Sequence, residues 1–202
     1  MRFIAALVLW LVILVGAGAA FVWSGIYNIG ADSPHWPVTA QILAALRNHS
    51  IAQHDANINV PDLDNPQLIA LGAKHYAEMC TGCHLAPGKT DSEMRTGLYP
   101  KPPNFTRTHI GNPAMAFWVI KHGIKMSAMP AWGKTHDDHK IWAMVAFVRQ
   151  LPNMSIARYK QLSAGNAHDG DDDDQDAATP DSGPAAASQT EHDDDGPGDP
   201  VR

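Results

Sequence analysis

The sequence has 202 residues, 45% of them apolar, enough for one ordinary domain with extensions or at most two small domains. Its formal net charge of −6 averages two unlike parts: residues 163–202 hold twelve acids and one base, whereas residues 1–162 hold fourteen bases and nine acids. This asymmetry excludes a uniformly acidic globule, because the acidic charge belongs to the C-terminal part and not to the rest.

An apolar segment begins the chain. Residues 3–23 run for 21 positions without a charged side chain, and a helix of that length spans about 32 Å, close to the bilayer core of about 30 Å. Trp23 and Tyr27 fall where interfacial aromatic side chains are expected. These features favour a retained transmembrane anchor. The Ala-Gly-Ala at residues 17–19 leaves a cleaved signal peptide as the alternative, and both predict that the rest of the chain is exported.

The next segment is predicted to be a neck. Residues 39–47 (TAQILAALR) have the apolar spacing of a short helix. Residues 57–66 are rich in Asn, Asp and Pro, which favours an extended or turn-like path. We expect this neck to act as a spacer and to pack against the domain that follows.

The main domain is predicted to be all-α, with no convincing strand. Three helices are expected, at residues 67–80, 113–122 and 135–151. The second begins with a proline and is followed by Gly123, the usual asymmetry of a helix. In the third, Thr135 is expected to be the N-cap with Asp138 at the N3 position.

The chain is thus expected to have four parts. These are an anchor at residues 1–23, a neck at 24–65, a helical domain at 66–152 and a C-terminal extension at 153–202. From about residue 163 the extension has no aromatic residue and one valine. Such a segment cannot bury enough apolar surface to offset its chain entropy, so we expect it to be disordered.

Both cysteines of the chain, Cys80 and Cys83, lie in a C-x-x-C-H motif that ends at His84. This is the pattern of c-type haem attachment. Two thiols three residues apart at the end of a helix can add to the two vinyl groups on one edge of a porphyrin. The histidine that follows then places its imidazole on the iron, with its ring N–H normally held by a backbone carbonyl.

Three other interpretations of the motif are weaker. A thioredoxin-like C-x-x-C requires a βαβ context, which this chain lacks. A zinc site would need two further ligands, and the scattered histidines are a loose match. A structural disulfide would leave His84 without a role.

With this motif, residues 66–152 resemble the class I monohaem c-type cytochromes. Gly72 and Tyr76 have the spacing of the Gly-x-x-x-aromatic pair that precedes the haem motif in that family, and residues 146–152 resemble its C-terminal helix. Phe147 would then pack against the N-terminal helix at Gly72. The resemblance implies a small cytochrome c-like helical domain around one covalently bound haem c.

The resemblance also implies the second axial ligand. In the family this is a methionine followed by proline in a loop, which corresponds to Met129, 45 residues after His84. Met126 is the alternative, although a methionine there more often fills space beside the porphyrin. His109, His122 or an open coordination site are the remaining candidates.

Other expectations concern the surroundings of the haem. The resemblance implies that the carbonyl of Pro102 or Pro103 accepts the ring N–H of His84; the alternative is a turn in which neither proline contacts the ligand. Trp118, Trp132 and Trp142 are expected to be haem-pocket or core aromatics. Five lysines are expected in loops around the haem edge: Lys89, Lys101, Lys121, Lys125 and Lys134. They are either an ordinary solvated surface or a docking ring for an acidic redox partner.

The acidic tail has three candidate roles. A plain solubilising tail is the simplest interpretation. The tail could also bind divalent cations weakly through its aspartates and histidines, or lie over the basic haem face as an electrostatic mask.

These features predict a single-electron carrier and not an enzyme. One haem would be held by Cys80 and Cys83, with His84 and Met129 as ligands of the iron. The chain would cross the inner membrane once, with the haem domain on the periplasmic side near membrane redox complexes or a periplasmic dehydrogenase or oxidase, and would bind no nucleic acid. The main alternative is a haem enzyme or gas sensor with an open sixth coordination site, and a third is a metal-handling module that acts through the tail.

Overall fold

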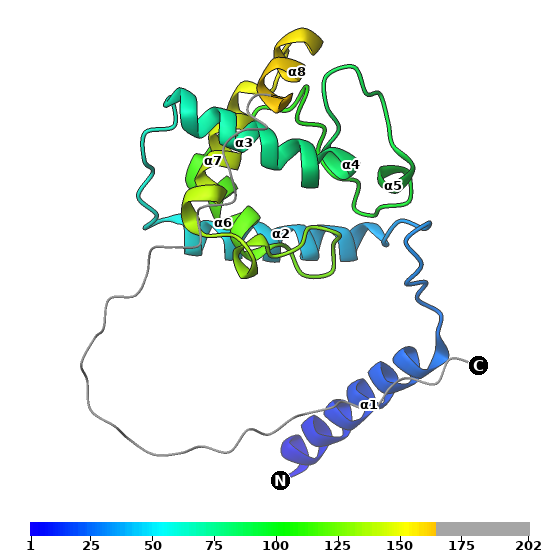
Figure 1. Ribbon diagram of the computed structural model, residues 1–202. Helices are drawn as coiled ribbons and strands as arrows, with labels where there is room; N and C mark the ends of the chain where they lie inside the picture. Colours follow the sequence, from blue (N-terminus) through cyan, green and yellow to red (C-terminus); the bar gives the residue numbers. More distant parts are fainter. Residues whose placement is uncertain (165–202) are drawn as a thin grey trace, which may run out of the picture. The chain divides into compact units, whose positions relative to one another are not determined.

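The computed structural model describes residues 1–164 (Figure 1). The predictions for the acidic tail therefore fall almost wholly outside the described residues. All regular secondary structure from residue 1 to residue 164 is helical. This confirms the all-α prediction for the part of the chain that the structure describes.

The N-terminal helix α1, Arg2–Ser24, covers the predicted apolar segment. None of its residues is buried against the rest of the protein. Its mean hydropathy is 2.6 over its most apolar window, so α1 is long and apolar enough to cross a membrane. The structure therefore contains the candidate anchor that the sequence predicts.

The neck helix α2, Pro37–Asp55, is longer than the predicted segment at residues 39–47. Its last turn is held by the main domain: Asp55 is buried, and its Oδ2 accepts a hydrogen bond from Asn112 Nδ2 at 3.1 Å. Ile51, one turn earlier, is also buried. The prediction ended too early because polar residues interrupt the apolar pattern, and the contact that continues the helix comes from a distant part of the sequence.

The core forms where α3, Pro66–Met79, crosses α7, Asp138–Gln150. Gly72 lies at the crossing, where an added Cβ would overlap the Ala143 carbonyl and lie 3.0 Å from the Phe147 Cβ. Tyr76 and Phe147 are fully buried, with ring centroids 5.3 Å apart. The structure thus confirms the predicted packing of Phe147 against the helix at Gly72.

The helix α6, Pro113–His122, has the predicted bounds. The cap of α7 differs from the prediction: Asp137 and not Thr135 is the N-cap, and its Oδ1 accepts from the Lys140 backbone N–H at 2.8 Å. Thr135 instead follows the short 3₁₀ helix η1, Trp132–Lys134, and its hydroxyl bonds the Trp132 carbonyl. The prediction placed the start of α7 too early because a preceding turn already engages Thr135.

The longest helix outside the predicted helical segments is α8, Ile156–Ala164. This helix lies in the segment assigned to the C-terminal extension and packs against α3. Its Tyr159 ring is 6.2 Å from the Phe147 ring. The helical packing around the core thus continues beyond residue 152.

Candidate haem site

The C-x-x-C-H motif lies where α3 ends and the single-turn helix α4, Thr81–His84, begins. The Cys80 backbone N–H donates to the Tyr76 carbonyl at 3.0 Å, and the His84 backbone N–H donates to the Cys80 carbonyl at 2.8 Å. Both cysteines are free thiols. Two thiols and an imidazole therefore lie on one short helical segment.

A buried tyrosine fixes the end of this segment. The Tyr76 hydroxyl donates a 2.7 Å hydrogen bond to the carbonyl of Leu85, the residue after His84, and both residues are fully buried. Burial raises the pKa of Tyr76 far above its ordinary value, so the hydroxyl stays a donor. The packed core at Gly72 and Phe147 is thus connected directly to the motif.

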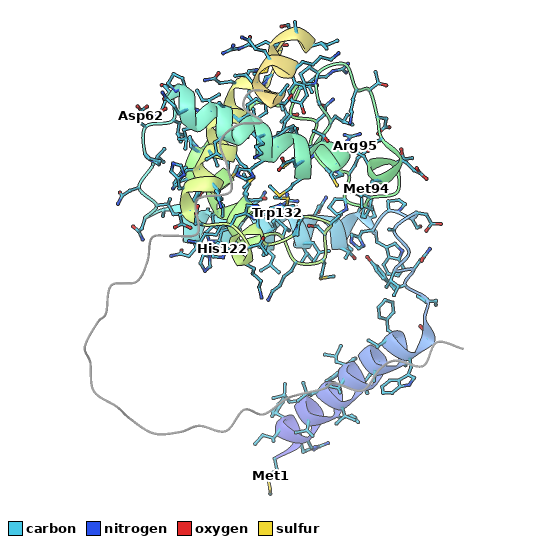
Figure 2. The ribbon with its side chains drawn as sticks, viewed as in Figure 1. Met1, Asp62, Met94, Arg95, His122 and Trp132 are labelled. Atoms are coloured by element: carbon cyan, nitrogen blue, oxygen red, sulfur yellow. The ribbon has the colours of Figure 1, made fainter. Side chains whose placement is uncertain are left out.

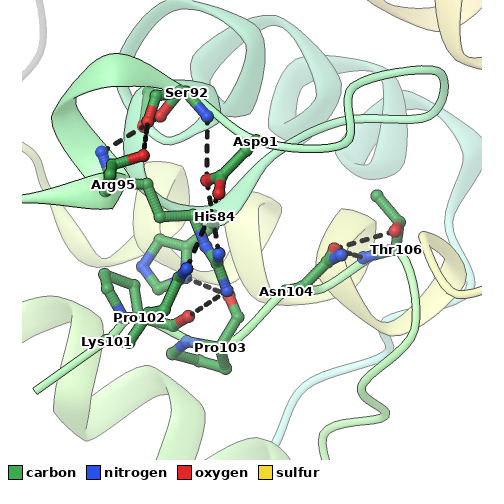
Figure 3. Close-up of polar contacts among 11 residues, drawn as sticks. His84, Asp91, Ser92, Arg95, Lys101, Pro102, Pro103, Asn104 and Thr106 are labelled. Carbon is green, nitrogen blue, oxygen red and sulfur yellow. Dashed lines mark hydrogen bonds and ion pairs between the residues drawn. The ribbon is translucent and has the colours of Figure 1, made fainter.

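The His84 ring is oriented by a backbone carbonyl. Its Nδ1 lies 2.9 Å from the Pro103 carbonyl oxygen (Figure 3). A carbonyl can only accept, so Nδ1 carries the proton and Nε2 keeps its lone pair. The contact is the one expected from Pro102 or Pro103, and Pro103 is the acceptor. The Phe105 ring also stacks on the imidazole, with centroids 4.5 Å apart and planes 16° apart.

The environment of His84 favours the neutral ring. Burial lowers the pKa of His84, and the positive charge of Arg95 acts in the same direction, whereas the hydrogen bond to Pro103 opposes both. Neutral imidazole is the form that binds metal ions. The tautomer and the charge state of His84 therefore both fit a metal ligand that binds through Nε2.

The loop that carries Pro103 is tied to the motif by polar contacts. Arg95, in the short helix α5, Glu93–Thr96, donates from Nη2 to the Pro102 carbonyl at 3.0 Å, and its Nη1 lies 3.5 Å from Asp91 Oδ1 (Figures 2 and 3). The Ser92 hydroxyl accepts from the Arg95 backbone N–H and donates to the Gly82 carbonyl. Arg95 and Phe105 were not among the predicted site residues, because no local sequence signal distinguishes them.

The two thiols have different surroundings. Burial, and to a lesser extent Cys83, raises the pKa of the Cys80 thiol to about 12. Cys80 is therefore a neutral thiol at pH 7. The Cys83 Sγ lies 3.4 Å from the Met94 Sδ.

Met129 lies in the loop between α6 and η1. The loop is closed by bonds from the Ile124 N–H to the Met129 carbonyl at 3.1 Å and from the Met129 N–H to the Ser127 hydroxyl at 3.2 Å. Gly123, at φ 67°, allows the loop to turn back, because an added Cβ there would lie 2.7 Å from the Met129 oxygen. Met129 is half-buried, whereas the side chain of the alternative ligand, Met126, is 81% exposed.

The two histidine alternatives to Met129 lie at the surface, and two of the tryptophans pack on aromatic rings. His109 and His122 are both exposed, and the His122 ring packs 4.9 Å from Trp118. Trp142 stacks on Phe117 at 4.2 Å and belongs to the edge of the core. Figure 2 labels His122 and Trp132 at the two ends of the segment that contains Met129.

Two of the five lysines expected around the haem edge are paired. Lys121 lies in α6 and not in a loop, with its Nζ 2.6 Å from Asp138 and above the Phe117 ring. The Lys101 Nζ is 3.6 Å from Asp91. The three that form no ion pair within residues 1–164 are exposed: Lys89, Lys125 and Lys134. Among residues 1–164, three of the five lysines are therefore left without an acidic partner.

The comparisons with known proteins agree with this site. Residues 67–148 match the model of the family described as cytochrome c oxidase, cbb3-type, subunit III. No curated protein and no solved structure matches the chain significantly. The family implies covalently bound haem c, and the donor set fits it: two free thiols and an imidazole with Nε2 available. Residues 67–148 are therefore a cytochrome c domain, and the N-terminal helix of the chain fits membrane anchoring.

Proposed function

We propose that this protein is a single-electron carrier with one covalently bound haem, tethered by α1 to the periplasmic face of the inner membrane. Cys80 and Cys83 would hold the porphyrin, and His84 and Met129 would be the axial ligands. When bound, the haem supplies an iron that changes between the ferric and ferrous states. The protein residues bind this group, orient it and restrict the access of water.

The observation that carries the proposal is the orientation of His84. Its Nδ1 donates to the Pro103 carbonyl and its ring stacks on Phe105, so protein groups set both the direction and the tautomer of the imidazole. A histidine in a structural disulfide motif would not need this arrangement. The contact therefore supports a ligand role and not a role in packing.

The surroundings of the two methionines support Met129 as the second ligand. Its loop is closed on itself at both ends by backbone and hydroxyl hydrogen bonds, and its side chain is half-buried. Met126 points into solvent instead. A thioether ligand is soft and favours the ferrous state, and with both axial positions filled the iron has no open position for a substrate. This supports electron transfer over the haem enzyme or gas sensor.

The matched family suggests the kind of partner. Its description names a subunit of an oxidase, so we propose that electrons pass between this haem and a membrane-bound redox complex. The exposed residues Lys89, Lys125 and Lys134 would meet an acidic docking face, because complementary charge speeds transient encounter. The tether would keep the haem domain near such a complex.

The experiment that tests this proposal measures intact mass and iron content of the purified full-length protein. We expect the wild type to carry the mass of one haem and one iron per chain, and the Cys80→Ser, Cys83→Ser double variant to carry no covalent haem. Thr81→Ala changes a residue inside the motif but keeps both thiols and the imidazole. It is the matched control and is expected to retain the haem. Zinc in place of haem, or more than one haem per chain, would contradict the proposal.

A further inference from the structure

The neck helix forms one wall of a cavity of about 680 Å³. The other walls are the α6 residues Trp118 and His122 and two loops, at residues 99–100 and 123–127. The lining is mostly apolar but includes several cationic or titratable side chains: His35, Arg47, His122 and Lys125. The helix α2 lies outside the segment that matches the cytochrome family.

The two loops connect this cavity to both proposed ligands of the iron. Residues 99–100 lead to Pro103, whose carbonyl holds His84. Residues 123–127 lead to Met129 and bond to its backbone. A planar group held by His84 and Met129 would lie between these loops, with one edge toward the cavity that both loops line. Cys80 and Cys83, which would hold the vinyl edge, do not line this cavity.

The helix α2 is fixed over this cavity at both of its ends. Before its first turn, the His35 backbone N–H donates to the Tyr99 hydroxyl at 3.2 Å, and the two rings meet edge to face at 5.2 Å. At its last turn, the buried Asp55 accepts from Asn112 at 3.1 Å. These contacts keep one side of α2 facing the cavity.

That side of α2 presents one full positive charge. Leu43, Ala44 and Ile51 supply apolar surface, and Arg47 lies among them in the cavity wall. The Arg47 Nε donates to Asn48 Oδ1 at 3.1 Å, and its terminal nitrogens bond no residue between 1 and 164. Both terminal nitrogens are therefore available to an acceptor.

We propose that α2 closes the haem site along the edge that bears the propionates, and that Arg47 binds a propionate carboxylate. This inference rests on the proposed function. The propionates are the charged groups of a haem, and a carboxylate in a largely apolar cavity needs a cationic partner. The planar guanidinium matches a carboxylate with two parallel hydrogen bonds, which a lysine cannot provide. Pairing also offsets a negative charge that would otherwise stabilise ferric iron.

The test is the midpoint potential of the full-length holoprotein in detergent, measured by optical titration at low salt and at 1 M salt. We expect Arg47→Gln to lower the midpoint, Arg47→Lys to lower it less, and the shift to persist at 1 M salt, where the Debye length is about 3 Å. Arg158→Gln, which removes an exposed charge on α8 away from the cavity, is the control and should leave the midpoint unchanged.

A midpoint potential in Arg47→Gln equal to that of Arg158→Gln would overturn the proposal. A shift that disappears at 1 M salt would also overturn it, because such a shift would come from a distant charge that salt screens. The optical spectra of the same samples separate this result from failure of the proposed function. If wild type lacks a covalent haem or methionine ligation, the proposed function is wrong. If all spectra are normal and only the midpoint fails to move, the role of Arg47 alone is wrong.

Discussion

His84 shows how far single residues could be predicted. The motif identified the histidine, and the family resemblance implied a proline carbonyl beside it, which the structure provides at Pro103. The stacking of Phe105 and the bonds of Arg95 could not be predicted. They depend on how the loop after α4 folds back over the motif, and no local pattern specifies that path.

A second histidine, His75, leads to a prediction about how the stability of the protein depends on pH. Burial lowers the pKa of His75, the nearby His136 acts in the same direction, and the His75 Nε2 is buried without a partner among the described residues. A group with a lowered folded-state pKa binds more protons when the protein unfolds. Its contribution to stability is therefore present above pH 6.5 and is lost as the pH falls through the folded pKa.

We expect the free energy of unfolding of the holoprotein to fall between pH 7 and pH 5, and to fall less steeply in His75→Gln. Denaturant titrations at several pH values measure this slope. His139→Gln, which changes an exposed histidine on α7, is the control and should keep the wild-type slope. Equal slopes in wild type and His75→Gln would show that this histidine is not responsible.

The crossing of α3 and α7 requires a residue without a side chain at Gly72. Gly72 leaves no room for a Cβ beside the Ala143 carbonyl, so Gly72→Ala must separate the two helices. We expect a loss of about 1–3 kcal/mol or more in the free energy of unfolding, by analogy with other overpacked cores. Urea denaturation followed by circular dichroism measures this loss.

Gly111→Ala is the matched control for this substitution. An added Cβ at Gly111 would have no atom within 4 Å, so we expect a change within about 0.5 kcal/mol, as for ordinary surface substitutions. If the two variants were equally stable, the close approach of α3 and α7 would not be a requirement of the fold.

The helices differ in how well the sequence predicted them, for physical reasons. The helix α6 begins with a proline after a capping asparagine and is followed by a glycine. Neighbouring residues in the sequence therefore determine both of its ends. The helix α2 extends beyond its apolar pattern because Asp55 bonds a distant asparagine. The helix α8 was missed because it is mostly exposed and takes its order from packing on α3.

For the molecule as a whole, the proposed membrane tether depends on α1. The helix is unburied along its full length and contains no acidic residue or lysine after Arg2. A soluble protein does not leave such a helix in water. If α1 is the tether, the mature protein keeps this helix in a membrane.

We expect the mature protein to retain residues 1–24 and to stay in the membrane fraction after an alkaline carbonate wash. Mass spectrometry of the purified protein identifies its first residue. A variant in which residues 1–24 are replaced by a cleavable signal peptide should appear in the soluble periplasmic fraction with the same haem spectrum. A mature wild-type protein that begins after residue 17 and is released by the wash would contradict the anchor.

The proposed ligation of the iron by His84 and Met129 is tested by the optical spectrum of the oxidised full-length protein in wild type, Met129→Ala and Met126→Ala. We expect a far-red methionine–iron charge-transfer band in wild type and in Met126→Ala, and its loss in Met129→Ala. Absence of the band in wild type, with carbon monoxide binding readily to the reduced protein, would show an open coordination site and contradict the electron-carrier account.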